Sequence, residues 1–303
     1  MSDMERDFKE EIHGLTEGRV LFDAPMRRFT SMRIGGPAEC LVFPKDVNEL
    51  RKVVLHARKK KIPLFILGKG TNLIVGDRGI RGWVVSLTEG MKEINREGEV
   101  VEAGAGATLQ RLVQFSVQRG LTGIEAFTGI PGTVGGGLAM NAGAWGLEMK
   151  DVLLSVSFLD EDGEVVERSR PRLKFGYRRL DFPSSWIILK GRFQLKRGSR
   201  EEMLERINSF SERRRKSQPL DHPSAGSIFK NPPEGPAGRW IEEAGLKGFR
   251  IGQAMVSDLH ANFIVNLGKA RAREVIDLIE WVERKVYQEK GVSLEREVKV
   301  IGE

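Results

Sequence analysis

The sequence predicts an α+β protein in which amphipathic helices alternate with several sheets. Three observations support this fold class. A strand–helix–strand pattern occupies roughly the first 90 residues. Alternating apolar residues over 151–169 predict a β-hairpin, and segments 199–216 and 270–290 carry apolar residues at helical spacing. At 303 residues the chain is long enough for two or three domains of ordinary size.

The N-terminal elements follow from caps and periodicity. Asp46 and Glu49 have the spacing of a capping box before the helix expected over 46–61. The apolar runs at 62–67 and 82–87 predict buried strands. A strand within 98–107 comes next, and Thr108 is expected to cap a helix that ends before Gly120.

The second half alternates strands with helices. Asp162 and Gly163 are expected to form the turn of the 151–169 hairpin, and 186–195 is expected to be a further strand. Between the two long helices we expect a short helix near 240–244 and a strand at 261–267, and a strand over 293–302 closes the chain. We predict three parts: 1–85 joined by 293–303, 86–197, and 198–292.

Composition restricts the class of protein. The net charge of +7, from 49 Lys and Arg against 42 Asp and Glu, suits nucleic acid or a small polyanionic ligand. The basic runs at 58–61 and 213–216 are short, and no zinc-finger, RRM or KH pattern accompanies them, which disfavours nucleic acid. The charged start lacks a secretory pattern, no apolar run predicts a membrane span, and Cys40 is the single cysteine, so we expect a cytoplasmic protein. The four histidines lack the spacing of metal ligands, so no metal site is expected.

Two glycine-rich stretches are the strongest functional signals. "GIPGTVGGGLAMNAGA" (129–144) has no charged residue, and it predicts either tight turns or a loop whose N–H groups bind a large polar ligand. "LGKGTNLIVGDRGIRG" (67–82) follows a strand directly, but it is neither a Walker A loop nor a GxGxxG turn that opens a helix. Two such loops, far apart in the sequence, predict a long ligand with a central diphosphate, such as FAD.

The two stretches resemble the FAD-binding segments of flavoproteins related to vanillyl-alcohol oxidase. Within that group the chain resembles the UDP-N-acetylenolpyruvoylglucosamine reductases, known as MurB. Four further stretches support the resemblance, in the family's order: "TSMRIGGPAE" (30–39), "FGYR" (175–178), "AGSIFKNP" (225–232) and "LEREVKVIGE" (294–303). The resemblance implies a two-subdomain FAD-binding module, 1–85 and 86–197, with a smaller α+β substrate-binding domain at 198–292.

The resemblance also implies the activity. The family reduces UDP-N-acetylglucosamine enolpyruvate to UDP-N-acetylmuramate for peptidoglycan, with NADPH as hydride donor and FAD as intermediary. Neither glycine-rich stretch contains His or Cys, so FAD is expected to be non-covalent. The implied partners are the UDP-sugar and NADPH, without nucleic acid or membrane insertion, and a monomer is compatible with the sequence. The short interval between the second glycine-rich stretch and Ser227 leaves no room for the inserted tyrosine loop of longer relatives, which places the chain in the shorter, type II subgroup.

Three residues match the family's catalytic positions. Ser227 matches the proton donor, and its alkoxide would need stabilisation, to which Lys230 could contribute. Arg178 matches the arginine whose planar fork suits a carboxylate, with a surface ion pair as the alternative fate and Arg179 as the neighbouring candidate. Glu297 matches the third catalytic residue, although Glu295 would lie on the same strand face.

The resemblance carries over a larger set of binding residues. In the run 213–216, Arg213, Arg214 or Arg215 could contact the substrate diphosphate in place of Lys216. The substrate-binding residues implied are Tyr177, Lys216, Lys230 and Asn231. The cofactor-binding residues implied are Gly68, Lys69, Gly70, Thr71, Asn72, Leu73, Gly129, Ile130, Pro131, Gly132, Thr133, Gly135, Gly136, Asn141, Ala142 and Gly143.

Two other functions compete with this interpretation. An FAD-linked oxidase of the same superfamily would share the glycine-rich stretches, and its reduced form would react rapidly with oxygen rather than with the UDP-sugar. A basic nucleic-acid-binding protein would be colourless, and its binding would weaken with salt.

Overall fold

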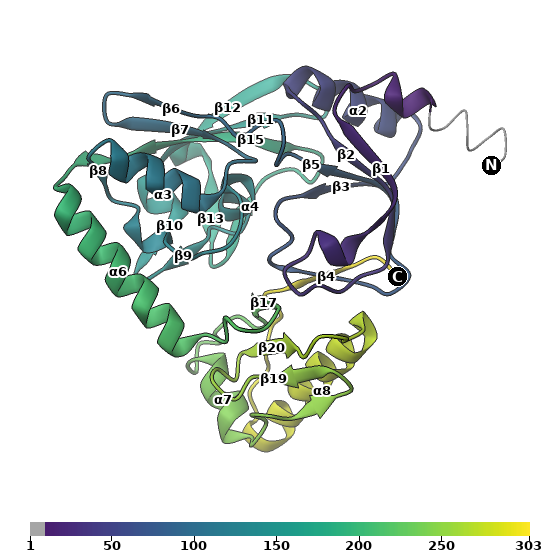
Figure 1. Ribbon diagram of the computed structural model, residues 1–303, viewed down its shortest axis with the longest axis vertical. Coiled ribbons are helices and arrows are strands. Elements are labelled where there is room, and N and C mark those ends of the chain that lie inside the picture. Colours follow the sequence, from purple (N-terminus) through teal and green to yellow (C-terminus); the bar gives the residue numbers. More distant parts are fainter. Residues whose placement is uncertain (1–9) are drawn as a thin grey trace. The chain divides into compact units, whose positions relative to one another are not determined.

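The computed structural model describes residues 10–303, which form two compact units (Figure 1). Unit 1 contains the described residues up to Phe22, Cys40–Lys69 and Gly82–Ser211. Unit 2 contains Asp23–Glu39, Gly70–Arg81 and Glu212–Glu303. Strands β1, β2 and β5 and helix α6 (Arg200–Ser217) run across this division. The three-part organisation stays a prediction.

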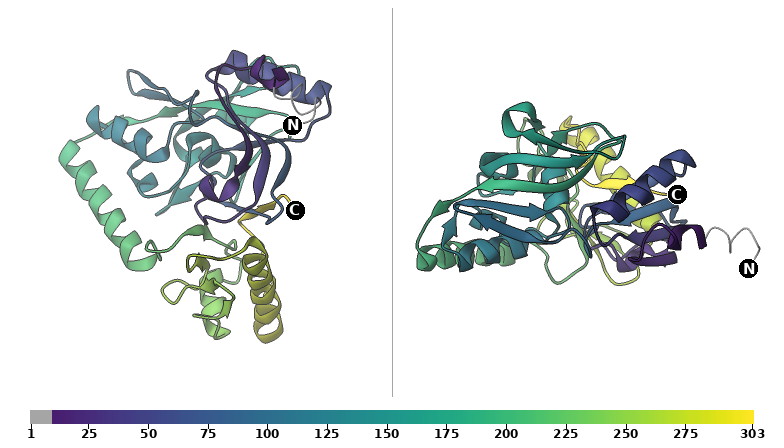
Figure 2. Two further views of the ribbon diagram at one scale, coloured as in Figure 1. Left: turned by 45° about the vertical axis from the view of Figure 1, so that its right-hand side comes forward. Right: turned by 90° about the horizontal axis from the view of Figure 1, so that it is seen from above.

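Two sheets build most of unit 1. A five-stranded antiparallel sheet has the order β12-β11-β15-β7-β6, and helices α3 and α4 lie on one side of it (Figures 1 and 2). A four-stranded sheet has the order β1-β2-β5-β3, in which β3 and β5 are parallel and Leu64 lies opposite Trp83. The bounds are β12 (Val165–Ser169), β11 (Leu153–Leu159), β15 (Ile187–Gln194), β7 (Val100–Gly104), β6 (Ile94–Glu97), β1 (Arg19–Pro25), β2 (Pro37–Phe43), β5 (Ile80–Ser86), β3 (Leu64–Leu67), α2 (Val47–Lys59), α3 (Leu109–Gln118) and α4 (Val134–Ala139).

Both predicted helix starts in unit 1 are confirmed. The Asp46 carboxylate accepts hydrogen bonds from the N–H groups of Asn48 (2.8 Å) and Glu49 (2.9 Å), so it caps α2. The Thr108 hydroxyl accepts from the Arg111 N–H (3.1 Å) and caps α3. The Glu49 carboxylate departs from the capping-box prediction, because it accepts from the Lys45 N–H (2.8 Å) one residue before the cap.

The hairpin predicted over 151–169 is present over 153–169, but its turn is longer than predicted. Leu159 pairs with Val165, so residues 160–164 form the turn rather than Asp162 and Gly163 alone. The Asp160 carboxylate accepts from the N–H groups of Asp162 (3.0 Å) and Glu164 (2.8 Å). This side-chain bonding closes a five-residue loop that a simple Asp-Gly signal does not reveal.

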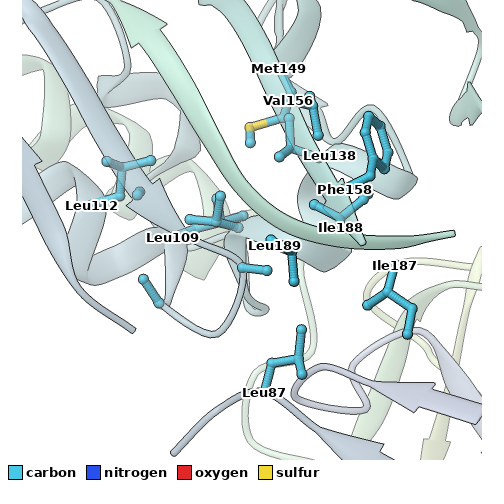
Figure 3. Packing of buried hydrophobic residues seen from close by; sticks show 14 of the residues in the cluster. Leu87, Leu109, Leu112, Leu138, Met149, Val156, Phe158, Ile187, Ile188 and Leu189 are labelled. Carbon is cyan, nitrogen blue, oxygen red and sulfur yellow. The ribbon is translucent and has the colours of Figure 1, made fainter. Parts of the chain in front are cut away.

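The core of unit 1 lies between the five-stranded sheet and its helices. Figure 3 shows Leu138 of α4 and Met149 close to Val156 of the sheet, and Leu109 and Leu112 of α3 belong to the same buried cluster. Gly191 of β15 lets α4 approach closely, because a Cβ there would lie 2.9 Å from Leu138. The second glycine-rich stretch is therefore anchored on a buried, close-packed surface.

Unit 2 packs two helices on a small antiparallel sheet. The sheet has the order β17-β20-β19-β18, and α8 lies alongside β19 and β18 (Figure 1). The Asp77 carboxylate caps α8, accepting from the N–H groups of Ala272 (2.8 Å) and Arg273 (3.0 Å). The predicted apolar stripe of this helix is buried. The bounds are β17 (Ser224–Ser227), β20 (Phe263–Asn266), β19 (Ala254–Val256), β18 (Arg250–Ile251), α7 (Ala237–Glu243) and α8 (Ala272–Lys290).

The closing segment has two partners instead of forming one strand over 293–302. Strand β21 (Lys299–Ile301) pairs in parallel with β4 (Leu73–Val75), which directly follows the first glycine-rich turn. The residues before it, 295–298, hydrogen-bond to 228–230. One short segment thus connects two parts of unit 2 that are far apart in the sequence.

The remaining elements are short. None of the helices within 10–303 is long and apolar enough to cross a bilayer. The remaining short elements are η1 (Met26–Arg28), β8 (Leu121–Thr122), η2 (Glu125–Phe127), β9 (Gly143–Ala144), β10 (Leu147–Glu148), α5 (Met149–Val152), η3 (Arg170–Arg172), β13 (Lys174–Gly176), β14 (Arg179–Asp181) and β16 (Lys196–Arg197).

Candidate active site

The two predicted cofactor loops meet in unit 1. A Cβ placed on Gly68 would lie 2.8 Å from the Thr133 hydroxyl, so the first loop touches the start of the second. That hydroxyl accepts from the Gly136 N–H (3.2 Å) and caps α4. Gly68 must therefore lack a side chain for the two loops to lie together.

Several backbone donors around this contact are left for a ligand or water. Within residues 10–303, the N–H groups of Gly68, Lys69, Gly129 and Gly132 donate no hydrogen bond to the protein. Gly129 and Gly132 have φ angles of 74° and 141°, which favour glycine. Open N–H groups on a glycine-rich loop suit an anionic group, so this part of unit 1 fits the diphosphate of FAD.

Part of the second stretch is a helix, where the sequence alone indicated a turn or loop. Helix α4 contains three consecutive glycines, and they have different surroundings. A Cβ on Gly135 would lie 2.8 Å from the Ala105 Cβ, so this glycine serves close packing. Gly137 is buried beside Leu109, whereas Gly136 is exposed. Internal packing thus explains some of the glycines, and the exposed ones remain candidates for ligand contact.

Other predicted residues of the second loop fix the position of its C-terminal end. Asn141 is fully buried, and its Nδ2 donates to the Glu148 carboxylate (3.0 Å) and to the Gly176 carbonyl (3.3 Å). Its side chain therefore joins the loop to the β13–β14 hairpin. Gly143 lies where a Cβ would be 2.4 Å from the Leu147 carbonyl, in the small β9–β10 hairpin. Ile130 and Ala142 are partly buried against the core of unit 1, and Pro131 is exposed.

Tyr177 and Arg178 form the turn of the β13–β14 hairpin. Gly176 pairs with Arg179 across this turn, and Arg178 has a φ angle of 55°. Such a left-handed conformation is uncommon for a residue with a Cβ, and it tends to occur at functional sites. The Arg178 guanidinium lies 5.2 Å from the Tyr177 ring, which is 47% exposed. Arg179 forms an ion pair with Asp181, as expected for the surface alternative.

The second half of the first glycine loop belongs to unit 2 and contacts the closing segment. Gly70 has a φ angle of 62°, and a Cβ there would lie 2.1 Å from the Phe29 carbonyl. The Asn72 side chain donates to the Glu297 carbonyl (3.0 Å), and its own carbonyl accepts from the Lys299 N–H (3.1 Å). Thr71 is half-buried, and Leu73 begins β4. A predicted cofactor residue therefore holds the backbone of the segment that contains Glu297.

Ser227 directly precedes the residues that hydrogen-bond to that same closing segment. It ends β17 after a bulge, since Ser224 pairs with Val265 and Ser227 pairs with Phe263, leaving two residues opposite one. Gly226 within the bulge has a φ angle of 78° and open space at its Cβ position. The Glu297 N–H donates to the Ile228 carbonyl (2.7 Å), so unit 2 brings Ser227 and Glu297 onto hydrogen-bonded neighbouring segments.

Lys230 and Asn231, two predicted substrate residues of unit 2, each have a side-chain contact within that unit. The Lys230 ammonium is 2.5 Å from the Glu295 carboxylate, which gives Glu295 a partner away from Glu297. The Asn231 side chain accepts from the Ala237 N–H (3.0 Å) before α7. Lys230 and Asn231 thus follow Ser227 on one backbone segment.

The four basic residues at the end of α6, 213–216, differ in how far they are exposed to solvent. Lys216 is exposed and forms an ion pair with Glu212 (2.6 Å). Arg214 is only 8% exposed, and burial lowers the pKa of its guanidinium. Its Nη1 donates to the Gln218 side chain (3.3 Å). Arg213 and Arg215 are exposed, so the choice of a diphosphate ligand in this run stays open.

Sequence reasoning missed two of these connections. The bond from Asn72 to Glu297 joins residues 225 positions apart, and no local pattern indicates it. The cap formed by Thr133 had a signal, because threonine precedes a six-residue segment without proline. The glycine run concealed it, since glycine is a poor helix former.

The fold and the loop geometry define an FAD-dependent oxidoreductase, and comparisons agree. The model of an FAD-binding domain family matches residues 38–169, and that of the C-terminal domain of UDP-N-acetylenolpyruvoylglucosamine reductase matches residues 218–301. The chain is 45% identical to the UDP-N-acetylenolpyruvoylglucosamine reductase of Caldanaerobacter subterraneus, covering 95% of this chain and 96% of that one. It is 47% identical to the Syntrophus aciditrophicus enzyme, covering 97% and 96%.

A solved structure completes the comparison. The crystal structure of MurB from Thermus caldophilus matches with a TM-score of 0.81 and 38% identity, covering 94% of this chain and 99% of that one. The chain belongs to the UDP-N-acetylenolpyruvoylglucosamine reductase family. The resemblance, the fold class and the enzyme class predicted from the sequence are therefore confirmed.

Proposed function

We propose that this protein reduces UDP-N-acetylglucosamine enolpyruvate to UDP-N-acetylmuramate, with NADPH as the hydride donor. The observation that carries the proposal is the position of Glu297. Its N–H is bonded to the segment that follows Ser227, and its carbonyl is bonded to Asn72 of the first glycine loop. A proposed catalytic carboxylate, proton donor and cofactor loop are thus joined through one backbone segment.

FAD would be held non-covalently by the two loops. The open N–H groups of Gly68, Lys69, Gly129 and Gly132 would bind its diphosphate. When bound, FAD would supply the hydride that NADPH provides to the vinyl carbon of the substrate. The other predicted cofactor residues would shape this surface, through close packing at Gly135 and through the cap at Thr133.

Arg178 would hold the substrate carboxylate. Negative charge develops on the carboxylate side of the enolpyruvyl group as hydride adds to its far carbon. A guanidinium can donate two parallel hydrogen bonds to that group, and stabilisation that grows with the charge lowers the barrier. The strained backbone of Arg178 would keep the guanidinium in place before the substrate arrives.

Ser227 would deliver the proton to the carbon that bears the carboxylate. Its hydroxyl is a weak acid, so a nearby group has to stabilise the alkoxide that forms. Glu297 would polarise the enol or hold Arg178 and substrate in register. Lys230 and Asn231, on the segment after Ser227, would bind the substrate together with Tyr177, and the basic run that includes Lys216 would contact the diphosphate.

We further propose that the enzyme acts in the cytoplasm, where the nucleotide precursors of peptidoglycan are made. The product would feed cell-wall synthesis, so loss of the enzyme would affect cell shape and division. The positive net charge of +7 suits three anionic ligands, the UDP-sugar, NADPH and FAD.

The test separates the two half-reactions in an anaerobic stopped-flow experiment. In Ser227→Ala, NADPH should bleach the flavin at the wild-type rate, while reoxidation by the UDP-sugar slows by about 100-fold or more, the usual share of a general acid. Ser224→Ala is a matched control, because it lies half-buried on the same strand. Rapid reoxidation of Ser227→Ala would refute the serine assignment, and a wild-type flavin that recovers its colour only with oxygen would refute the substrate.

A further inference from the structure

The backbone after Ser227 changes partners within two residues. The β17–β20 ladder stops where Ser227 pairs with Phe263. The chain then turns to the closing segment, where the Ile228 carbonyl accepts from the Glu297 N–H (2.7 Å) and the Lys230 N–H donates to the Glu295 carbonyl (2.8 Å). This switch leaves the Ile228 N–H and both polar groups of Phe229 to find other partners.

Asn262 bonds all three of these groups. Its carbonyl accepts from the Ile228 N–H (2.9 Å), its Oδ1 accepts from the Phe229 N–H (2.9 Å), and its Nδ2 donates to the Phe229 carbonyl (2.8 Å). Asn262 is 3% exposed and Phe229 is 2% exposed, so water cannot readily replace these bonds. The Asn262 side chain thus satisfies the Phe229 backbone groups that a neighbouring strand would otherwise bond.

The position of Ser227 depends strongly on this anchor. On its N-terminal side the ladder is interrupted by the bulge at Ala225 and Gly226, and Gly226 is the residue with most conformational freedom. On its C-terminal side, Asn262 fixes the next two residues from one flank while 295–297 bond the other. The backbone that carries Ser227 is thus fixed on its C-terminal side by bonds that include those of Asn262.

We propose that Asn262 is a positioning residue for the reaction: its amide holds the Phe229 backbone and thereby sets the place from which Ser227 delivers its proton. This inference rests on the proposed function of Ser227. Asn262 itself touches no reacting atom. Displacement of a catalytic group by about 1 Å can cost about 100-fold in rate, so loss of the anchor should affect the step that uses Ser227.

The experiment compares Asn262→Ala with Asn266→Ala. Asn266 is a matched control: it is 1% exposed, belongs to the same stretch of chain, and its amide also bonds backbone, at Met32, Gly268 and Ala270. Asn262→Asp is the second variant, which keeps the acceptor for the Phe229 N–H and loses the donor to its carbonyl. Each FAD-loaded variant is mixed anaerobically with NADPH and then with the UDP-sugar.

We expect Asn262→Ala and Asn262→Asp to slow flavin reoxidation by the UDP-sugar at least 10-fold, while bleaching by NADPH stays within twofold of wild type. Asn266→Ala should show no such separation between the two half-reactions. The double variant Ser227→Ala/Asn262→Ala should reoxidise no more slowly than Ser227→Ala alone, because a residue that acts through the serine has nothing left to position.

A second readout is independent of catalysis. Hydrogen exchange of the peptide covering 224–231 should accelerate in both Asn262 variants and should stay unchanged in Asn266→Ala. The inference would be overturned if flavin reoxidation in both Asn262 variants stayed within twofold of wild type. It would also be overturned if the double variant were slower than Ser227→Ala by the full factor that Asn262→Ala shows alone. A normal rate in Ser227→Ala would instead overturn the proposed role of the serine, and that single variant reports it separately.

Discussion

Neighbouring glycines in α4 should respond to alanine in opposite ways. Gly136 is exposed, and the nearest atom to an added Cβ is the Thr133 hydroxyl at 3.4 Å, an ordinary contact distance. Gly135 faces Ala105, where an added Cβ would lie 2.8 Å from the Ala105 Cβ and 3.2 Å from its carbonyl oxygen. Main chain cannot move aside as a flexible side chain can, so α4 would have to shift.

The free energies follow from these distances. Alanine in a helix avoids the entropy that glycine loses on folding, so Gly136→Ala should raise the free energy of unfolding of the FAD-free protein by about 0.5–1 kcal/mol. Gly135→Ala should lower it by about 1–3 kcal/mol, the usual cost of overpacking. If FAD lies against the exposed face of α4, Gly136→Ala should also weaken FAD affinity at least 10-fold despite the gain in stability.

Urea unfolding of the FAD-free protein measures the first quantity, and titration with FAD measures the second. A variant that is more stable and yet binds FAD less tightly cannot be explained by damage to the fold. Wild-type FAD affinity in Gly136→Ala would refute the assignment of Gly136 to the cofactor surface. Wild-type stability in Gly135→Ala would refute the packing argument for the glycine run.

Two further predictions concern charged side chains. Arg178→Lys should lower kcat/KM for the UDP-sugar about 100-fold and leave bleaching by NADPH unchanged, because the charge is kept and the fork is lost; near-normal turnover would count against the carboxylate role. Glu125 is 5% exposed: burial raises the pKa of its carboxyl, but hydrogen bonds from Arg206 and Thr122 outweigh burial and lower the pKa below its ordinary value. The stability that ionised Glu125 contributes should therefore be present at neutral pH and be lost as the pH falls below about 4.5 through the folded pKa. In urea unfolding at pH 7, the free energy of unfolding of the wild type should be about 1–2 kcal/mol higher than that of Glu125→Gln, and this difference should shrink towards pH 3. A difference that stays constant with pH would contradict a stabilising ion pair between Glu125 and Arg206.

Local signals predicted local structure well. The caps at Asp46 and Thr108 and the apolar stripe of α8 are present because each depends on residues within a few positions of one another. The same reasoning failed at α4, where intrinsic propensity opposes a helix and contacts with Ala105 and Leu109 stabilise it. The sequence also predicted too long a final strand, 293–302 instead of Lys299–Ile301, because nothing local indicates that 295–298 and 299–301 bond to different partners.

The candidate site was predictable through the family resemblance more than through pattern. Composition and glycine spacing alone led to a diphosphate ligand, and the motifs then supplied Arg178, Ser227 and Glu297. The bonds that position those residues, from Asn72 and Asn262, connect distant parts of the sequence. A single sequence holds no periodicity or spacing that reports such contacts.

The order in which the chain is synthesised gives the closing segment a further consequence. Every piece of unit 1 has been translated by Ser211, whereas unit 2 combines two early pieces with residues 212–303. Met32, Ile34 and Ile74 of the early pieces belong to a core whose other members come later. These side chains therefore lack their core partners until residues 225–298 have been translated. Because β21 is the last strand of unit 2 to be made, a nascent chain can complete unit 1 well before it brings Ser227 and Glu297 together.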